Sequence, residues 1–477
     1  MSRDELSALE AAFLYAESPM TPMHIGSLSI FDAEGWRLPD GTLRVAALRR
    51  HIEARLPAVP RLVQHPIWPL GPLGRPYWAA DPDFDISRHV RRLTLRVPGG
   101  DEQLMAAVAD LHMHLLDRHH PLWEMWFVDG LSGGRVALVE KIHHALVDGI
   151  GGVDVAMLQL DTEPHPAPAG AGPTSPDGAV GAKSGSPGAV GLLARALLDM
   201  VEEPVAAARA ATRRMAHPAG AILESRRLVG AAADLLGDLR APHTSLNDPI
   251  GPRRVYRVVR QPLERIRRSA HALGGSVNDA VLAAVASAVY DLLEHRGEDL
   301  QGARLHALVP VSVRSDDEHE ALGNRVSAMV IPLEATQPDA AARFAAAHAA
   351  VRSARAHHQV ELTTALLRMA EFLPEPLLAS ASGLIHHQFL VNLVITNVPG
   401  PPVPLYLMGA RMLEACPIVP LGGNLGVSVG ILSYEGQLTF GLWADAEHVP
   451  DLDRFAKGIE HGFAALDMAV AAGHTGA

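Results

Sequence analysis

The spacing of hydrophobic positions along the chain predicts a mixture of helices and strands. Apolar residues recur every three or four positions in some segments and alternate with polar residues in others, as in amphipathic helices and half-buried strands. Helices are predicted at residues 4–16, 43–55, 102–117, 276–296, 338–356 and 451–467, after Gly152, and along 191–239. Strands are predicted at residues 25–31, 126–131, 135–142, 305–313, 326–333, 390–398, 425–434 and 437–445. Such mixing predicts an α/β architecture in both halves of the chain.

One segment between the two halves lacks a pattern for any packed element. Residues 161–190 contain six Pro and six Gly, a composition typical of a flexible linker. This boundary predicts an N-terminal domain at 1–160, a linker at 161–190 and a C-terminal domain at 191–477. Each half is long enough to hold its own core.

Composition and charge exclude several classes of protein. The chain has 477 residues, of which 48% are hydrophobic and 20% charged, so it is not a mostly disordered chain. Its net charge of −12 argues against general nucleic-acid binding, which needs a basic surface. Cys416 is the sole cysteine, so no intramolecular disulfide and no cysteine-based metal site are expected.

No secretory signal and no membrane-spanning segment are apparent. The first ten residues carry three acidic side chains and lack an apolar run, and no stretch reaches about 18 uncharged apolar residues. We therefore expect a cytoplasmic protein whose contact with a membrane, if it has any, is peripheral.

The segment KIHHALVDGIGG, residues 141–152, carries the chemistry. His143 and His144 follow directly after a predicted strand, and Asp148 and Gly149 precede the next predicted helix. Histidine suits proton transfer near neutral pH because its ordinary pKa is about 6.5. A metal site at His143, His144 and Asp148 is the competing interpretation. It is poor geometry, because adjacent residues at a strand end point to opposite faces.

These residues resemble a known family. His143 to Gly149 match HHxxxDG, the motif of the bacterial wax ester synthase/diacylglycerol acyltransferase family, within the wider CoA-dependent acyltransferases. Further segments resemble the family's motifs in the same order. They are LSALEAAFLYAESPMTPMHIGSLSIF (6–31), PLW (121–123), TSLNDPIGPRR (244–254), Asn278-Asp279, VPVSVR (309–314), Gly323-Asn324, TNVPGP (396–401) and LSYEGQLTFGLWAD (432–445). The resemblance spans nearly the whole chain apart from the linker, although Asp248 replaces the usual glycine of its motif.

The resemblance implies a fold and a tunnel. Two chloramphenicol-acetyltransferase-like domains are expected, each with a mixed β-sheet flanked by helices. A tunnel is expected at their interface, with His144 near its middle. The C-terminal domain is expected to lend a strand or loop to the first.

The resemblance also implies roles for individual residues. His144 is expected to be the general base, while Asp148 is expected to pair with Arg314 and shape the loop that contains Gly149. His143 is expected to face away from His144 in a supporting role. The remaining residues in family motifs are candidates for oxyanion contacts or for lining the channel: Asn278, Asn324, Thr396 and Asn397.

The function that the resemblance implies is O-acyl transfer. Long-chain acyl-CoA is the expected donor, diacylglycerol the expected acceptor, and a fatty alcohol a second one. No cofactor and no metal are expected. The protein is expected to make peripheral contact with the inner membrane or with lipid inclusions. The alternatives are an acyltransferase for another alcohol, such as a polyketide diol or a glycolipid, a condensation domain, and a non-catalytic lipid-binding protein of the same fold.

Weaker signals favour ordinary structural roles. Gly426 to Gly430 read GVSVG, a literal GxSxG, but no helix follows, so Ser428 is predicted to be a strand residue. Cys416 is predicted to be inert in its apolar stretch. The paired arginines at 213–214 and 226–227 are typical of a solvated helix face, with contact to lipid phosphates as the alternative.

Overall fold

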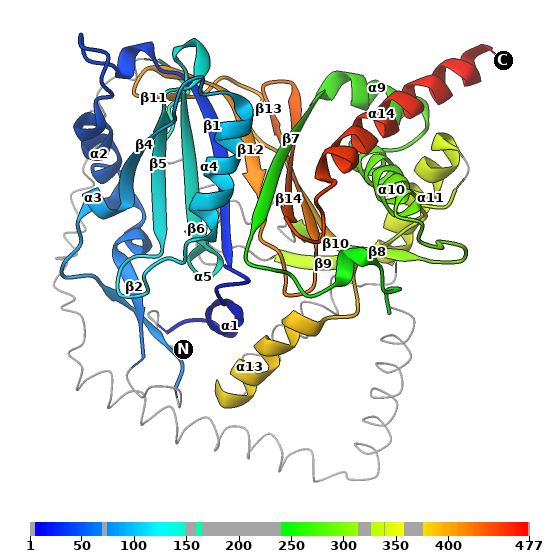
Figure 1. Ribbon diagram of the computed structural model, residues 1–477, viewed down its shortest axis with the longest axis horizontal. Coiled ribbons are helices and arrows are strands. Elements are labelled where there is room, and N and C mark those ends of the chain that lie inside the picture. The colour runs from blue at the N-terminus through cyan, green and yellow to red at the C-terminus, as the bar shows by residue number, and fades with distance from the viewer. Residues whose placement is uncertain are drawn as a thin grey trace, which may run out of the picture.

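A computed structural model of the chain describes residues 5–68, 74–147, 159–164, 240–312, 326–337, 339–356 and 375–475. The predicted helices after Gly152 and along 191–239 lie outside these ranges. The other predicted helices and strands each correspond to an observed element. The strands at 326–333 and 437–445 have the predicted ends, and most of the other elements have shifted ends. The α/β prediction is therefore confirmed in both halves of the chain (Figure 1).

The first half of the chain builds most of one mixed sheet. Its elements are α1 (Ala8–Ala16), β1 (His24–Asp32), η1 (Glu34–Trp36), α2 (Val45–Glu53), η2 (Leu56–Ala58), η3 (Pro60–Val63), β2 (Gln64–Ile67), β3 (Tyr77–Ala80), α3 (Ile86–His89), β4 (Val90–Thr94), α4 (Asp101–Met113), β5 (Trp123–Asp129), η5 (Ser132–Gly134), β6 (Val136–His143) and α5 (His144–Val147). Two strands from the second half, β11 (Tyr406–Leu407) and β12 (Ala410–Ile418), complete this sheet. Its order is β11-β12-β1-β6-β5-β4, and of these strand pairs only β4 and β5 are parallel. A separate small hairpin joins β2 and β3.

The second half builds a second mixed sheet. Its elements are η6 (Ser245–Asn247), β7 (Arg254–Pro262), α9 (Leu263–Ala272), α10 (Val277–His295), β8 (Leu305–Ser312), β9 (Val326–Leu333), α11 (Ala340–Ala356), α13 (Glu375–Ser382), η7 (Gly383–His387), β10 (Leu393–Val398), β11 (Tyr406–Leu407), β12 (Ala410–Ile418), β13 (Val427–Tyr434), β14 (Gln437–Asp445) and α14 (Leu452–Thr475). The sheet order is β7-β14-β13-β10-β8-β9, with β10 parallel to both β8 and β13.

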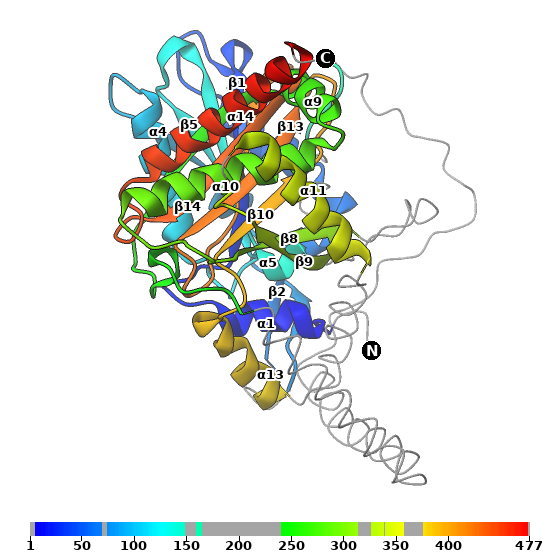
Figure 2. The same ribbon diagram turned by 90° about the vertical axis from the view of Figure 1, so that its right-hand side faces the viewer.

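Helices cover one face of the second sheet. Figure 2 shows α14, α10 and α11 lying across its strands. Helix α10 is the centre of this layer, because twelve of its residues are buried, eleven of them Ala, Val or Leu, and because it packs against both α14 and α11. Ser276 begins it with a capping box, in which its side chain accepts from the N–H of Asp279 and the Asp279 carboxylate accepts from the N–H of Ser276. The predicted N-cap is confirmed.

Strand β12 links the two halves, because it belongs to the second half in sequence but pairs with β1 in the first sheet. The antiparallel register runs from Gly26 opposite Ile418 to Asp32 opposite Arg411. The expectation that the C-terminal half lends a strand to the first is therefore confirmed. Figure 1 shows β12 next to β1, on the side of the first sheet that faces the second.

Two glycines let β12 cross close to the second sheet. Gly430 and Gly441 lie opposite each other on β13 and β14. A Cβ atom at Gly441 would lie 1.8 Å from the carbonyl oxygen of Pro417, and one at Gly430 would lie 3.0 Å from the Pro417 ring. Because neither glycine has a side chain, the backbone and ring of Pro417 can approach the sheet at this point more closely than any larger residue would allow. The close crossing positions β1, and with it β6, against the second half.

Two of the three weaker signals have structural explanations, and the third, the paired arginines at 213–214 and 226–227, lies outside the described residues. Ser428 lies within β13, buried, and its hydroxyl donates to the carbonyl of Val419 at 2.7 Å, so the strand prediction is confirmed. Cys416 lies on β12 and is fully buried, and burial raises the pKa of its thiol well above the ordinary value.

Among the described residues, no single helix combines the length and apolarity needed to cross a bilayer. One pair, α9 with α10, meets that criterion only when the two are joined across a bend of 97°.

Candidate active site

The two histidines lie where β6 ends and α5 begins. Every residue of β6 is buried, and β6 pairs with β1 on one side and β5 on the other. The N–H of His143 donates to the carbonyl of Leu122 at 3.0 Å, and the N–H of His144 donates to the carbonyl of Met23 at 2.7 Å. Leu122 belongs to the PLW segment, whose backbone thus holds the first histidine. The backbone of His143 and His144 is therefore held by hydrogen bonds from two neighbouring segments, one containing Leu122 and the other Met23.

The His144 ring is partly buried and packs against α1. Its imidazole stacks on the ring of Phe13, with centroids 3.9 Å apart and planes 18° apart. Within the described residues, Nδ1 of His144 is buried without a hydrogen-bond partner. Burial, followed by the neighbouring His143, lowers the pKa of His144 to about 4. The ring is therefore neutral at pH 7, which is the form that can accept a proton.

His143 is fully buried and makes different contacts. Its Nδ1 lies 3.0 Å from the backbone nitrogen of Ala145, and its Nε2 lies 3.3 Å from Oε1 of Glu17. A backbone N–H can only donate, so Nδ1 accepts and the ring proton is on Nε2. Burial lowers the pKa of His143, although the Glu17 carboxylate opposes that effect. His143 is thus a neutral ring held between Glu17 and the first turn of α5.

Glu17 is the centre of a buried group of charged and imidazole side chains. The carboxylate is 2% exposed, and it contacts His24 Nε2 at 3.2 Å and Arg118 Nη2 at 2.9 Å in addition to His143. Neither imidazole N–H is aligned on the oxygen, so these two contacts are mainly electrostatic. Burial alone would raise the pKa of Glu17, but the contacts with His143 and His24 outweigh it and hold that pKa well below its usual range. Glu17 is therefore a carboxylate at neutral pH.

Three other candidates lie in the second half of the chain. The amide of Asn397 on β10 lies 3.5 Å from Oδ1 of Asn278, the second residue of α10. The structure thus brings these two side chains together, in a long contact with each other. Thr396 is opposite Gly430 in the sheet and, as the neighbour of Asn397 on a strand, points to the other face. The contacts of His144 described above come from α1 and the backbone of Met23 rather than from these three residues.

The remaining candidates lie outside the described residues. They are Asp148, Gly149, Arg314 and Asn324. Within the described ranges, no group of three or more His, Cys, Asp or Glu side chains is arranged to hold a metal ion.

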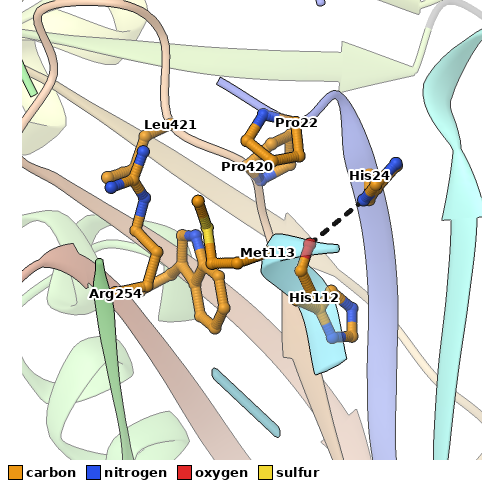
Figure 3. Close-up of a pocket in the computed structure, with 8 residues that line it drawn as sticks. Pro22, His24, His112, Met113, Arg254, Pro420 and Leu421 are labelled. Atoms are coloured by element: carbon orange, nitrogen blue, oxygen red, sulfur yellow. Dashed lines mark hydrogen bonds between the residues drawn. The ribbon is translucent and has the colours of Figure 1, made fainter. Parts of the chain in front are cut away.

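A small cavity lies between the two halves, next to this site (Figure 3). Its lining consists of Pro22, His24, His112, Met113, Arg254, Pro420, Leu421 and Trp443. His144 does not line it, but His24 does, and Nδ1 of His24 donates to the backbone carbonyl of His112 at 3.1 Å, as Figure 3 shows. Burial, followed by Lys141 and His24, lowers the pKa of His112 well below the ordinary value. The wall of the cavity therefore combines a neutral imidazole at His112, the ring of His24 and the guanidinium of Arg254 with apolar side chains.

Phe13, Glu17 and His24 are site residues that the sequence did not single out. All three lie in the segment 6–31, which resembles a family motif but does not itself indicate a role for any of them. A Glu after a helix, followed seven residues later by a His at the start of a strand, is the sequence signal that could have found them, and it lies far from the motif at 143–149. Folding brings this segment under the histidine pair because β1 pairs with β6, with His24 opposite His143.

Comparison with known proteins places the chain among acyltransferases. A model of the wax ester synthase/diacylglycerol acyltransferase catalytic domain matches residues 6–281, and a model of the corresponding C-terminal domain matches residues 322–467. A probable diacylglycerol O-acyltransferase of Mycobacterium tuberculosis is 33% identical over 478 residues, covering 97% of this chain and 96% of the relative.

Solved structures support the same grouping. A wax ester synthase/diacylglycerol acyltransferase from Marinobacter aquaeolei VT8 aligns with a TM-score of 0.69 and 26% identity, covering 98% of this chain and all of that chain. A trichothecene 15-O-acetyltransferase from Fusarium sporotrichioides aligns with a TM-score of 0.61 at 11% identity, covering 97% of this chain and 94% of that chain, which is a likeness of fold alone. The predicted two-domain acyltransferase fold is therefore confirmed.

Proposed function

Because the chain belongs to the wax ester synthase/diacylglycerol acyltransferase family, we propose that it transfers a long-chain acyl group from acyl-CoA to the free hydroxyl of diacylglycerol. The products are triacylglycerol and free CoA. The enzyme is an acyltransferase, and the name of its Mycobacterium tuberculosis relative supports diacylglycerol as the acceptor.

The observation that carries the proposal is the state of His144. Its backbone is anchored through Met23, its ring is held against Phe13, and burial keeps it neutral with a pKa of about 4. An alcohol is a weak nucleophile at pH 7 because it holds its proton, so a fixed neutral imidazole is the group the reaction needs. General-base catalysis of this kind supplies about 10²–10⁴-fold in rate.

The reaction proceeds in two steps with His144 as the base. The acceptor hydroxyl loses its proton to His144 Nε2 as its oxygen attacks the thioester carbonyl, which gives a tetrahedral intermediate with a negative oxygen. The intermediate then expels the CoA sulfur, which takes the proton back from His144, and the new ester remains. The assignment to Nε2 is supported by the burial of Nδ1.

No cofactor or metal has a step in this scheme, because the thioester is already activated and the base is a side chain. Hydrogen-bond donors are still needed for the negative oxygen. Asn278, Thr396 and Asn397 stay candidates for contacts along the substrate channel, as does Asn324. The pairing of Asp148 with Arg314, and the turn at Gly149, stay part of the proposal for the loop after His144.

The tunnel at the interface between the two halves is also part of the proposal. Acyl-CoA would enter it from one side and the acceptor from the other. The small cavity beside His24 supports the tunnel because it lies between the two halves of the chain.

Long-chain alcohols are a second acceptor class, favoured by the name of the family and by the Marinobacter structure. The test supplies purified enzyme with labelled palmitoyl-CoA and either diacylglycerol or hexadecanol, and identifies the labelled product by mass spectrometry. Labelled triacylglycerol supports the proposal. Labelled wax ester alone would move the main activity to alcohols, and neither product would refute the proposal.

We also propose peripheral contact with the cytoplasmic face of the inner membrane or with lipid inclusions, because diacylglycerol and triacylglycerol reside there. Helix α13 packs against α1, which carries Phe13, and Figures 1 and 2 show the two helices side by side. Leu377 on α13 is 58% exposed, so it is a candidate for lipid contact near the active site.

The membrane proposal is tested by flotation with vesicles of phosphatidylcholine and diacylglycerol. Leu377→Glu is expected to reduce the bound fraction. The matched control is Val97→Glu, which changes an exposed apolar side chain in the loop between β4 and α4. Equal binding of both variants and the unmodified protein would contradict contact through α13.

A further inference from the structure

We propose that Glu17 is a positioning residue for His144, acting through His143 and through the backbone of Met23. The inference rests on the proposed function, because it concerns the base of that reaction. Glu17 is the C-cap residue of α1, and among the described residues its carboxylate contacts Met23, His24, Arg118 and His143 rather than the His144 ring itself. Glu17 instead positions two backbone groups near that ring, those of Met23 and Ala145.

The first connection runs through Met23. The backbone N–H of Met23 donates to Oε1 of Glu17 at 3.2 Å. The carbonyl of the same residue accepts from the N–H of His144 at 2.7 Å. A displacement of the carboxylate therefore releases Met23, which is the residue that fixes the backbone nitrogen of the base.

The second connection runs through the His143 ring. Nε2 faces Oε1 of Glu17 at 3.3 Å, and Nδ1 accepts from the N–H of Ala145 at 3.0 Å. The two nitrogens have opposite roles, so the ring can do both only as the neutral Nε2–H form. A carboxylate facing Nε2 favours that form, because it attracts the proton there and repels a lone pair. Glu17 thus sets the tautomer that lets His143 cap the first turn of α5.

A permanent charge at this place needs compensation, and the structure provides it. Arg118 follows α4 and contacts Oε2 of Glu17 at 2.9 Å, while the same guanidinium donates to the carbonyl of Leu14 at 2.7 Å. His24 on β1 approaches Oε1 from the other side. The carboxylate is therefore surrounded by groups from α1, β1, β6 and the segment after α4. Such an arrangement is rigid, which is what a base that must stay within reach of a hydroxyl requires.

The consequence for Phe13 is geometric. Phe13 and Glu17 are four residues apart, at the end of α1, so they lie on the same side of that helix. One residue therefore contacts the face of the His144 ring, and the other holds the backbone beneath it. Helix α1 sets the base in both position and orientation.

The test compares Glu17→Gln and Glu17→Asp with the unmodified enzyme. The amide keeps the size of the carboxylate but removes the charge that selects the His143 tautomer. We expect Glu17→Gln to lower kcat about 10- to 100-fold, the effect of a misplaced base, with KM for palmitoyl-CoA within about twofold. Glu17→Asp keeps the charge and should recover part of the lost kcat.

A second readout separates positioning from general damage. Hydrogen exchange of the peptide 141–147 should become faster in Glu17→Gln, because the amides of His144 and Ala145 lose their anchors. The matched control is Glu10→Gln, which changes another buried carboxylate on α1 that serves its own N-terminal cap with Ser7. It should leave kcat and the exchange of 141–147 unchanged.

Several outcomes would overturn the inference. One is a Glu17→Gln variant whose kcat and hydrogen exchange at 141–147 equal those of the unmodified enzyme. Another is a Glu10→Gln variant that loses as much kcat as Glu17→Gln. If Glu17→Gln does not fold, His143→Asn and His143→Leu take its place, since only Asn retains an acceptor for the Ala145 N–H. Asn should then be at least about tenfold more active than Leu, and equal activities would overturn the proposal. If the unmodified enzyme makes no acyl product, the proposed function fails, while the exchange data still test the anchoring.

Discussion

The imidazole of His144 lies face to face with the ring of Phe13, at 3.9 Å between centroids and 18° between planes. The contact joins a helix near the start of the chain to the residue proposed as the base. It removes one face of the imidazole from water, in keeping with burial as the first cause of the lowered His144 pKa. The stacking of Phe13 on His144 therefore helps to keep the His144 ring unprotonated.

Replacing Phe13 should therefore change the pH dependence of the reaction. With a pKa of about 4, His144 stays unprotonated throughout the range above about pH 5, so kcat/KM should be flat there. In Phe13→Ala, water reaches the ring, the pKa rises toward 6.5, and the acidic limb moves to higher pH. We expect kcat at pH 7 to fall about tenfold because the ring also loses its fixed orientation.

The pH–rate profile of thiol release measures both effects. Tyr15→Phe is the matched control, since it removes a hydroxyl on the same helix that donates to Glu375 rather than contacting His144. An acidic limb at the same pH in Phe13→Ala and the unmodified enzyme would contradict the account of the stacking.

The buried pair of Arg254 and Asp445 should contribute strongly to stability. Nη1 of Arg254 lies 3.1 Å from Oδ2 of Asp445, the side chains are 1% and 0% exposed, and Arg254 also donates to the carbonyl of Met20 in the first half of the chain. Arg254→Met removes the buried cation and its bond to Met20, while the Asp445 carboxylate still accepts from the backbone N–H groups of residues 251, 447 and 448. We therefore expect a loss of about 1.5–3 kcal/mol of unfolding free energy, the range for a hydrogen bond to a charged group.

The neighbouring arginine provides the control for that measurement. Arg253 pairs with Glu447, but these side chains are 72% and 46% exposed. Arg253→Met should therefore cost less than about 1 kcal/mol. Denaturant unfolding of the two variants tests the contrast, and similar losses would show that burial does not set the strength of the Arg254 pair.

Gly441→Ala should disturb the junction between the two halves. The added Cβ would lie 1.8 Å from the carbonyl oxygen of Pro417, so β12 must move away from β14. Overpacking of this kind costs about 1–3 kcal/mol. Gly383→Ala is the control because a Cβ there meets nothing within 4 Å. A thermal unfolding curve of Gly441→Ala that overlies the control would refute the close crossing of β12.

Much of the fold can be predicted from the sequence where local patterns are strong. Helix α10 has a capping serine and a long apolar pattern, and the β13–β14 hairpin has a two-residue turn at Glu435 and Gly436, both with positive φ. Strand β12 was not predicted, because Pro417 and two charged residues interrupt its pattern. Its pairing with β1 depends on tertiary contacts that local sequence does not contain.

The candidate site divides in the same way. The HHxxxDG motif points to His144 because chemistry and spacing coincide in one short segment. Phe13 carries no such signal, since an aromatic residue at helical spacing is ordinarily core, and Glu17 is a single carboxylate among many. Their roles depend on the pairing of β1 with β6, which places segments more than a hundred residues apart in contact.

The measurement that tests the central claim most directly is thiol release from palmitoyl-CoA by purified protein. Diacylglycerol, hexadecanol or no acceptor is supplied, and each reaction is repeated with His144→Ala, after binding of palmitoyl-CoA by both proteins has been verified. We predict release that depends on the acceptor and falls at least about 10²-fold in the variant. Acceptor-dependent release that persists unchanged in His144→Ala would contradict the assignment of the base, and no release by folded, palmitoyl-CoA-binding protein would contradict the proposed function.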